Sequence, residues 1–257
     1  MKSLDARTTE LIKLINSSKN IVFFTGAGVS TDSGIPDFRS KNGLYKRKDA
    51  QFEGCSPEYL LSASCLKFDT EIFYKFFRQM MDFRYCEPNI VHRTIAELER
   101  KGKNVTVVTQ NVDGLHRKAG STDVCEIHGT ALRNYCVNCF QEFDGGYIFS
   151  SNEAIPTCPT CGGKVRPDVT LYEEALPGSA WSRAQAKTAR ADLVIVCGTS
   201  LKVYPAASLL MFARRSRLVI INRDKTDMDH TAALVFHEEL KDVFEMVASN
   251  FGRAKRG

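Results

Sequence analysis

The stretch NIVFFTGAGVS, residues 20–30, places a short apolar run directly before a glycine-rich turn. An apolar run without polar alternation is typical of a strand buried on both faces of a parallel sheet. Gly26 and Gly28 allow a tight turn and the close approach of a backbone to a pyrophosphate, which the N-terminus of a following helix would favour. The stretch therefore predicts the first strand and turn of a nucleotide-binding α/β sheet.

The same order, an apolar run and then polar residues, recurs three times along the chain. NVTVV (104–108) precedes TQNVDG, DLVIV (192–196) precedes CGTS, and RLVII (217–221) precedes NRD. Helical periodicity is found in residues 7–18, 70–84, 88–102 and 205–215. Strands that alternate with helices predict a parallel sheet covered on both faces.

Ligands of such sheets bind beyond the carboxyl ends of the strands. The polar residues that follow the four strands are therefore expected to line one crevice. Asn222 could hydrogen-bond a ribose hydroxyl there, and Thr199 and Ser200 could bind phosphate or ribose oxygens. Each of these residues taken alone also fits a turn without a ligand.

The chain departs from the dinucleotide fingerprint of dehydrogenases. Thr31 stands at the position of the third glycine, and no acidic residue follows a strand about 20 residues later. About 75 residues separate the glycine turn from the next strand, instead of the ~30 of an ordinary βαβ unit. The sequence therefore does not predict a standard dehydrogenase half.

Four of the nine cysteines form two CxxC motifs, CVNC (136–139) and CPTC (158–161), with 18 residues between them. Each motif can supply two thiolates to a tetrahedral zinc ion. The other five are scattered and odd in number, so a disulfide framework is not expected. Four thiolates complete the coordination of zinc, and the site is therefore predicted to be structural, with Cys136, Cys139, Cys158 and Cys161 as ligands.

Length and composition favour an ordinary globular protein. At 257 residues, one large core with a smaller satellite is expected. The net charge of +5 is mild and indicates no particular partner. The first 20 residues mix charges into their apolar positions, and no run of about 18 apolar residues occurs. The protein is expected to be soluble and cytoplasmic, without a membrane partner.

Six segments together resemble the sirtuins, which are NAD-dependent protein-lysine deacylases. They are GAGVSTDSGIPDFRS (26–40), TQNVDGLH (109–116), CEIHG (125–129), the paired CxxC motifs, CGTSLKVYPA (197–206) and INRD (221–224). The resemblance runs from about residue 10 to residue 245 in the family's order, and the short form is similar to the bacterial members. It implies a Rossmann-type, doubly wound parallel sheet formed by residues 1–39, 88–130 and 166–257. A smaller domain would comprise a helical insertion, 40–87, and a four-cysteine zinc ribbon, 131–165.

The resemblance also implies NAD as co-substrate, one structural zinc ion and roles for individual residues. Asp113 would receive the nicotinamide amide, and His128 would act as general base through the ribose hydroxyls, a role that suits an imidazole near neutral pH. Asn111 would orient the ribose or its water. The products would be free lysine, nicotinamide and O-acetyl-ADP-ribose. The residues expected to contact NAD are Gly26, Ala27, Gly28, Thr31, Asp37, Phe38, Arg39, Gln110, Val112, Asp113, Gly198, Thr199, Ser200, Asn222 and Asp242.

By the same resemblance, the partner is an acetylated or otherwise acylated lysine of a protein, bound as an added strand between the two domains. The segments expected to flank it contain Val169, Leu171, Tyr172, Glu173, Val203 and Tyr204. Glu173 stands where the family usually has glycine, and we expect it to favour peptides with basic flanks. Family members that remove acidic acyl groups carry Tyr and Arg three apart, whereas Phe77 follows Tyr74 at that spacing. Neutral acyl groups are therefore expected.

Two other functions compete with deacylation. The same site could transfer ADP-ribose onto a protein side chain. A zinc-ribbon module that binds nucleic acid would need clustered Lys and Arg, yet residues 140–157 contain none and include Glu142, Asp144 and Glu153. Binding of nucleic acid is therefore not expected, and the sequence predicts no oligomeric state.

Overall fold

The computed structural model describes residues 6–37, 43 and 52–251 of the chain. Its main sheet has six parallel strands in the order β3-β2-β1-β7-β8-β9. The strands are β1 (Asn20–Thr25), β2 (Asn104–Thr109), β3 (Val124–Glu126), β7 (Leu193–Cys197), β8 (Arg217–Ile221) and β9 (Leu234–Phe236). Strand order runs outward in both directions from β1 and β7, so the switch point of a doubly wound sheet lies between these two strands. The predicted Rossmann-type fold is confirmed.

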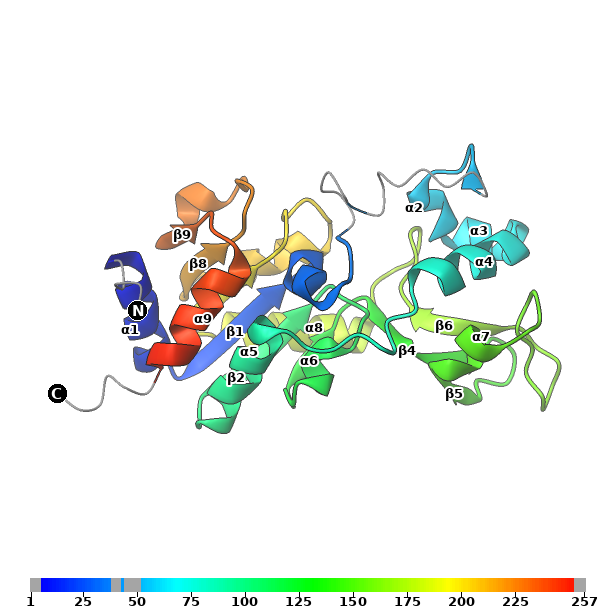
Figure 1. Ribbon diagram of the computed structural model, residues 1–257, viewed down its shortest axis with the longest axis horizontal. Helices are drawn as coiled ribbons and strands as arrows, with labels where there is room; N and C mark the ends of the chain where they lie inside the picture. The colour runs from blue at the N-terminus through cyan, green and yellow to red at the C-terminus, as the bar shows by residue number, and fades with distance from the viewer. Residues whose placement is uncertain (1–5, 38–42, 44–51, 252–257) are drawn as a thin grey trace.

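Both faces of this sheet are buried beneath helices, as the continuous apolar runs predicted (Figure 1). Successive side chains of a strand point to opposite faces, so Phe23 packs with one hydrophobic cluster and Phe24 with the other. The first cluster includes residues of α1 (Ala6–Ser17), α5 (Ile90–Arg100) and α9 (Leu240–Asn250), and the second includes residues of α8 (Gly178–Ala189) and the 3₁₀ helix η4 (Ala206–Phe212). Among the described residues, no helix combines the length and apolarity that a membrane span requires.

A second body of the protein lies at the far end of the long axis, where Figure 1 shows α2, α3, α4 and α7 around a small sheet. Its elements are α2 (Pro57–Leu60), α3 (Ala63–Phe68), α4 (Thr70–Met80), α7 (Gly146–Ser150), β4 (Gly129–Cys136), β5 (Glu142–Asp144) and β6 (Val165–Val169). One hydrophobic cluster joins Phe73 and Phe77 of α4 to Cys136, Ile148 and Val165 of the cysteine-rich segment. The two inserted segments therefore share one core.

Some local structure differs from the sequence-based prediction. The segment after the glycine turn is a 3₁₀ helix, η1 (Ala27–Ser33), which ends at Gly34 in the left-handed conformation. Residues 205–215 contain η4 where an α-helix was expected. The edge strands β3 and β9 have only three residues each, too few for a periodic signal, and were not predicted. The short helix α6 (Leu115–Lys118) also was not predicted.

At the switch point, the glycine turn after β1 packs directly on the backbone of the loop after β7. The amide of Gly28 donates a hydrogen bond of 2.9 Å to the carbonyl of Gly198. A Cβ atom on Gly28 would lie 2.8 Å from the Cα of Gly198, and one on Gly198 would lie 2.6 Å from the amide nitrogen of Val29. Gly198 also has a φ of +58°. These glycines thus serve contact between two loops, which the GAG motif alone did not reveal.

The zinc ligands predicted from the CxxC motifs lie together. The Sγ atoms of Cys136, Cys139, Cys158 and Cys161 are all within 4.8 Å of one another. The separations are 3.4 Å between Cys136 and Cys161 and 3.7 Å between Cys139 and Cys158. Sulfurs around a tetrahedral zinc with bonds of about 2.3 Å would be roughly 3.8 Å apart. The four thiols therefore fit one zinc ion with no open position.

The glycine contact predicts unequal costs for two alanine substitutions. Gly198→Ala adds a clash with the backbone of Val29 to a left-handed φ, so it should lower the free energy of unfolding by about 3 kcal/mol. Gly34→Ala is the matched control, because Gly34 has a φ of +85° but open space around it. It should cost about 1 kcal/mol. Urea unfolding measures both values, and equal losses would contradict a specific role for the contact.

Removal of zinc should unfold the smaller body before the main sheet. Cys136 and Cys158 are buried in its core, so thiolates without a metal would be left in apolar surroundings. We expect one zinc ion per chain by elemental analysis, lost in Cys158→Ser. Cys125→Ser is the control, because Cys125 is buried in the main sheet and should leave the zinc content unchanged. Hydrogen exchange after chelation should rise in β4 and β6 first. An equally early rise of hydrogen exchange in β1 would contradict this order.

Candidate nucleotide site

The polar residues after β1, β2, β3 and β7 meet at the carboxyl edge of the sheet. Gln110, after β2, donates from Nε2 to Oγ1 of Thr199 beyond β7 at 3.1 Å. Asn111 donates from Nδ2 to the carbonyl of Gly26 in the turn after β1 at 3.1 Å. The Nδ1 atom of His128, two residues beyond β3, lies 2.9 Å from the carbonyl of Gln110. Hydrogen bonds thus connect four strand ends into one site.

Asp113 is the buried acidic group of this site, with 5% of its surface exposed. Its Oδ2 accepts a hydrogen bond of 2.6 Å from the hydroxyl of Ser30, and its Oδ1 accepts one of 2.9 Å from the amide of Leu115. Burial raises the pKa of the Asp113 carboxyl, and the two donors oppose that rise. A carboxylate offers about four acceptor positions, so two remain for the N–H groups of a ligand amide.

Ser30 lies at the centre of the polar network, although the sequence did not single it out. It is fully buried, it donates to Asp113, and it receives a hydrogen bond of 3.2 Å from Nδ2 of Asn111. Ser30 thereby links the glycine-rich segment to the residues after β2. A serine in a turn is too common to predict this contact, which arises only when β1 and β2 pair in parallel.

His128 is held in one neutral form. A carbonyl can only accept a hydrogen bond, so the contact with Gln110 places the proton on Nδ1. Nε2 then carries the lone pair, and no hydrogen bond to it occurs within the described part of the chain. Burial lowers the pKa of His128, which the hydrogen bond to Gln110 partly opposes. The imidazole is therefore neutral and able to accept a proton at Nε2 near neutral pH.

The other described residues predicted to contact NAD are exposed or half-buried, and two of them hydrogen-bond to backbone carbonyls two or three residues away. Thr31 is exposed and its hydroxyl bonds the carbonyl of Gly28, while Asn222 donates from Nδ2 to the carbonyl of Asp224 at 2.7 Å. Asp242 is exposed in the first turn of α9. Half-buried positions are occupied by Ala27, Asp37, Val112 and Ser200. Phe38 and Arg39 fall outside the described residues. The part played by each in binding NAD stays a prediction.

The segment around Tyr172, which is predicted to flank the substrate peptide, is hydrogen-bonded to the helical insertion. Tyr172 donates its amide to the carbonyl of Leu61 at 3.0 Å and accepts from the amide of Ala63 at 3.1 Å. Glu173 has a φ of +75°, a conformation that favours glycine. Its carboxylate accepts a hydrogen bond of 2.9 Å from the amide of Ser64 at the start of α3. The exposed Glu173 side chain therefore compensates for an unfavourable backbone conformation with a helix-capping contact.

The remaining predicted peptide residues differ in exposure. Val169 and Leu171 are buried in the core of the smaller body, whereas Tyr172 is 37% exposed. Val203 is half-buried, and Tyr204 is 75% exposed just before η4. Only the exposed tyrosines and Glu173 offer substantial surface to a partner. The buried pair instead fixes the position of the segment.

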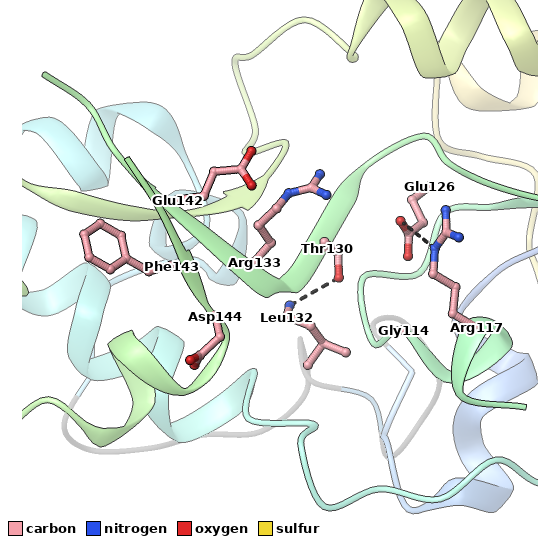
Figure 2. A pocket seen from close by; sticks show the side chains of 9 residues that line it. All are labelled: Gly114, Arg117, Glu126, Thr130, Leu132, Arg133, Glu142, Phe143 and Asp144. Carbon is pink, nitrogen blue, oxygen red and sulfur yellow. Dashed lines mark hydrogen bonds and ion pairs between the residues drawn. The ribbon is translucent and has the colours of Figure 1, made fainter. Parts of the chain in front are cut away.

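A separate hollow of about 480 Å³ lies between α6 and the zinc-binding sheet (Figure 2). Arg117 on its rim pairs with Glu126 at 3.2 Å, and Arg133 pairs with Asp168. Leu132 is exposed between these charges. None of the residues predicted to contact NAD lines this hollow. Glu142 and Asp144 add two further carboxylates to the lining. The nucleotide site is distinct from this hollow, because the two share no residue.

Comparison with known proteins agrees with this geometry. The model of the Sir2 family matches residues 26–205. A protein of Clostridium tetani named NAD-dependent protein deacetylase is 46% identical over 94% of this chain and 97% of its own length. A Staphylococcus epidermidis protein of the same name is 45% identical over 94% and 96%.

Solved structures show the same fold. A Sir2 protein with a deacetylated p53 peptide and 3′-O-acetyl ADP-ribose superposes with a TM-score of 0.87 and 34% identity, covering 95% of this chain and 98% of its own. A Sir2 complex with a p53 peptide and NAD⁺ gives a TM-score of 0.84 at 33% identity, over 96% and 99%. The matched family model spans most of the chain, and both sequence and fold agree over nearly its whole length. The chain therefore belongs to the Sir2 family, the sirtuins.

Proposed function

We propose that this protein is an NAD-dependent protein-lysine deacetylase that releases nicotinamide, O-acetyl-ADP-ribose and free lysine. The observation that carries the proposal is the neutral His128, whose free Nε2 belongs to the same hydrogen-bonded site as Asp113 and Asn111. The name shared by relatives more than 40% identical supports the same activity. Products that contain ADP-ribose in a related structure support it further.

The residues present fit NAD. When bound, NAD supplies nicotinamide as leaving group and a ribose that receives the acyl group. Asp113 would orient the nicotinamide amide through its two remaining acceptor positions. Gly26, Gly28 and Thr199 would approach the phosphates and ribose closely, because they lie at the switch point of the sheet. The other residues assigned to NAD from the resemblance belong to this proposal.

His128 would act as the general base. Its Nδ1–H is fixed on the carbonyl of Gln110, so the ring cannot rotate freely and Nε2 faces away from that contact. A proton from a ribose hydroxyl would be taken up at Nε2. Asn111 would hold the ribose or its water, and its side chain is already positioned by Gly26 and Ser30.

The substrate would be a peptide with an acylated lysine, added as a strand beside Tyr172 and Tyr204. Neutral acyl groups fit best. The hydroxyl of Tyr74 donates to the carbonyl of Val165 at 2.6 Å, and the guanidinium of Arg78 donates to three carbonyls of residues 148, 153 and 154. Both side chains are therefore engaged in joining α4 to the zinc-binding segment. Neither is available for a carboxylate on the acyl group.

The proposal includes the two-domain division, with residues 40–87 and 131–165 forming the smaller domain, and zinc in a purely structural role. A cytoplasmic location is part of it, supported by the five cysteines outside the zinc site, which form no disulfide and suit a reducing compartment. Transfer of ADP-ribose onto a protein and binding of nucleic acid are not favoured. The names of the relatives support neither of these activities.

His128→Ala should lower kcat for acetyl-lysine peptide by roughly 10²–10⁴-fold, because it removes the general base. Release of nicotinamide and formation of O-acetyl-ADP-ribose, followed by mass spectrometry, measure the reaction. His230→Ala is the control, since His230 is exposed and lies outside the site. ADP-ribosylated protein without O-acetyl-ADP-ribose would contradict the proposal.

The lowered pKa of His128 also predicts the pH dependence of the reaction. In a plot of kcat/KM against pH, the fall on the acid side should occur below about pH 6.5.

Glu173 should favour peptides with basic residues next to the acylated lysine, by a factor of about two to five as expected for an exposed ion pair. Glu173→Gly should abolish this preference, and so should Glu173→Gln, which retains an oxygen to accept from the Ser64 amide. Comparing kcat/KM for matched acidic and basic peptides measures it. If only the glycine variant loses the preference, the loop conformation and not the charge sets it. A preference unchanged in both variants would contradict both explanations.

A further inference from the structure

Two buried histidines lie behind the nucleotide site and take no part in the proposed chemistry. His92 of α5 is fully buried, and His116 of α6 is 2% exposed. Their ring centroids are 4.7 Å apart at an interplanar angle of 62°. Two ionisable rings packed together without solvent must both be neutral or find a partner.

Each ring has one nitrogen with a partner and one without. The amide of Asn89 donates to Nδ1 of His92 at 3.3 Å, which places the proton of His92 on Nε2. Nε2 of His116 lies 3.1 Å from Oγ1 of Thr25. The buried Nε2 of His92 and Nδ1 of His116 have no hydrogen-bond partner among the described residues. A buried polar atom left unpaired costs free energy, so two on adjacent rings call for a common explanation.

We propose that one buried water bridges the Nε2–H of His92 to Nδ1 of His116, so that the pair forms a neutral relay that positions the glycine turn. The tautomers are complementary. If His116 accepts at Nδ1, its proton lies on Nε2 and donates to the hydroxyl oxygen of Thr25. The relay then runs from Asn89 through both rings to the end of β1, with every polar atom satisfied.

The ends of the relay are attached to the site itself. The Asn89 side chain donates from Nδ2 to the carbonyl of Val29 at 2.8 Å and to the hydroxyl of Ser33 at 3.0 Å. Thr25 directly precedes Gly26 of the turn. His116 lies one residue beyond Leu115, whose amide binds Asp113. The pair thus acts as a set of positioning residues behind the segments after β1 and β2.

Burial is the main reason why the pair stays neutral. Burial lowers the pKa of His92 to about 4, and the charge of Arg93 on the same helix adds to this effect. Burial, and then His92, lower the pKa of His116 well below its ordinary value. Among the described residues, no carboxylate contributes to either shift. Since the folded pKa values lie below the unfolded value near 6.5, the stability that the pair provides is complete above pH 6.5 and is lost as pH falls toward 4.

The tautomers can be observed directly by long-range ¹H–¹⁵N NMR of the histidine rings. At about pH 7 we expect both rings neutral with the proton on Nε2, and no change on lowering the pH to about 6, since both folded pKa values lie below the ordinary value. A proton on Nδ1 of His116, or a charged ring at neutral pH, would overturn the proposal. This measurement uses the unmodified protein, so it stands even if variants fail to fold.

A double-mutant cycle tests the coupling. His92→Phe and His116→Phe should each destabilise the protein to urea, and the double variant should lose less than the two losses summed, because no nitrogen is then left unpaired between the rings. Additive losses would contradict the coupling. Neither this cycle nor the NMR measurement requires NAD turnover. Their failure is therefore distinguishable from failure of the proposed deacetylase activity.

The positioning role itself rests on the proposed function and is tested by kinetics. His116→Phe should raise KM for NAD by about tenfold, the equivalent of one lost hydrogen bond, with kcat and KM for the peptide changed less than about twofold. His116→Gln, which keeps a donor for Thr25, should recover part of the loss. Equal rises in both KM values, or no rise for NAD, would show that the pair does not position the turn.

Discussion

The contact between the glycine turn after β1 and Gly198 after β7 is the constraint on which the rest of the site depends. It lies where the strand order reverses, and the two backbones approach too closely for any side chain at Gly28 or Gly198. The loops therefore meet, and the residues that follow both strands come within hydrogen-bonding reach. Gln110 can then bridge to Thr199, and His128 can be oriented by the carbonyl of Gln110. A wider separation would leave the same side chains in solvent.

Around this contact the protein buries polar groups and satisfies most of them internally. Ser30 connects Asn111 to Asp113, while Asn89 holds the far side of the same turn. Such a network costs little once complete, yet it fixes the geometry of the loops before a ligand arrives. Within the described residues, Nε2 of His128 makes no hydrogen bond, and Asp113 accepts only two.

The smaller body is stabilised by different means. Its core is aromatic and includes two of the four cysteines, so metal ligation and hydrophobic packing depend on each other. Arg78 joins α4 to the zinc-binding segment through carbonyl groups, and Glu173 caps α3 from the peptide segment. The peptide segment therefore connects both inserted parts. Glu173 and Tyr172 contact the helical insertion, and the preceding strand β6 pairs with β4.

The sequence by itself determined the class of fold and the four-cysteine cluster, and it predicted the polar residues that meet after the strands, because these depend on local patterns. Apolar runs identify buried strands, the CxxC spacing identifies a site with four cysteine ligands, and the polar residues after each strand must meet at one edge of a parallel sheet. Only the tertiary structure decided the roles of Ser30, Asn89 and the pair His92 and His116. Their contacts join segments as many as 91 residues apart, and a buried polar side chain has no periodic signature that reveals its partner. The tertiary structure likewise showed that Glu173 has a conformation suited to glycine, since φ is set by the surrounding chain and not by the residue type alone.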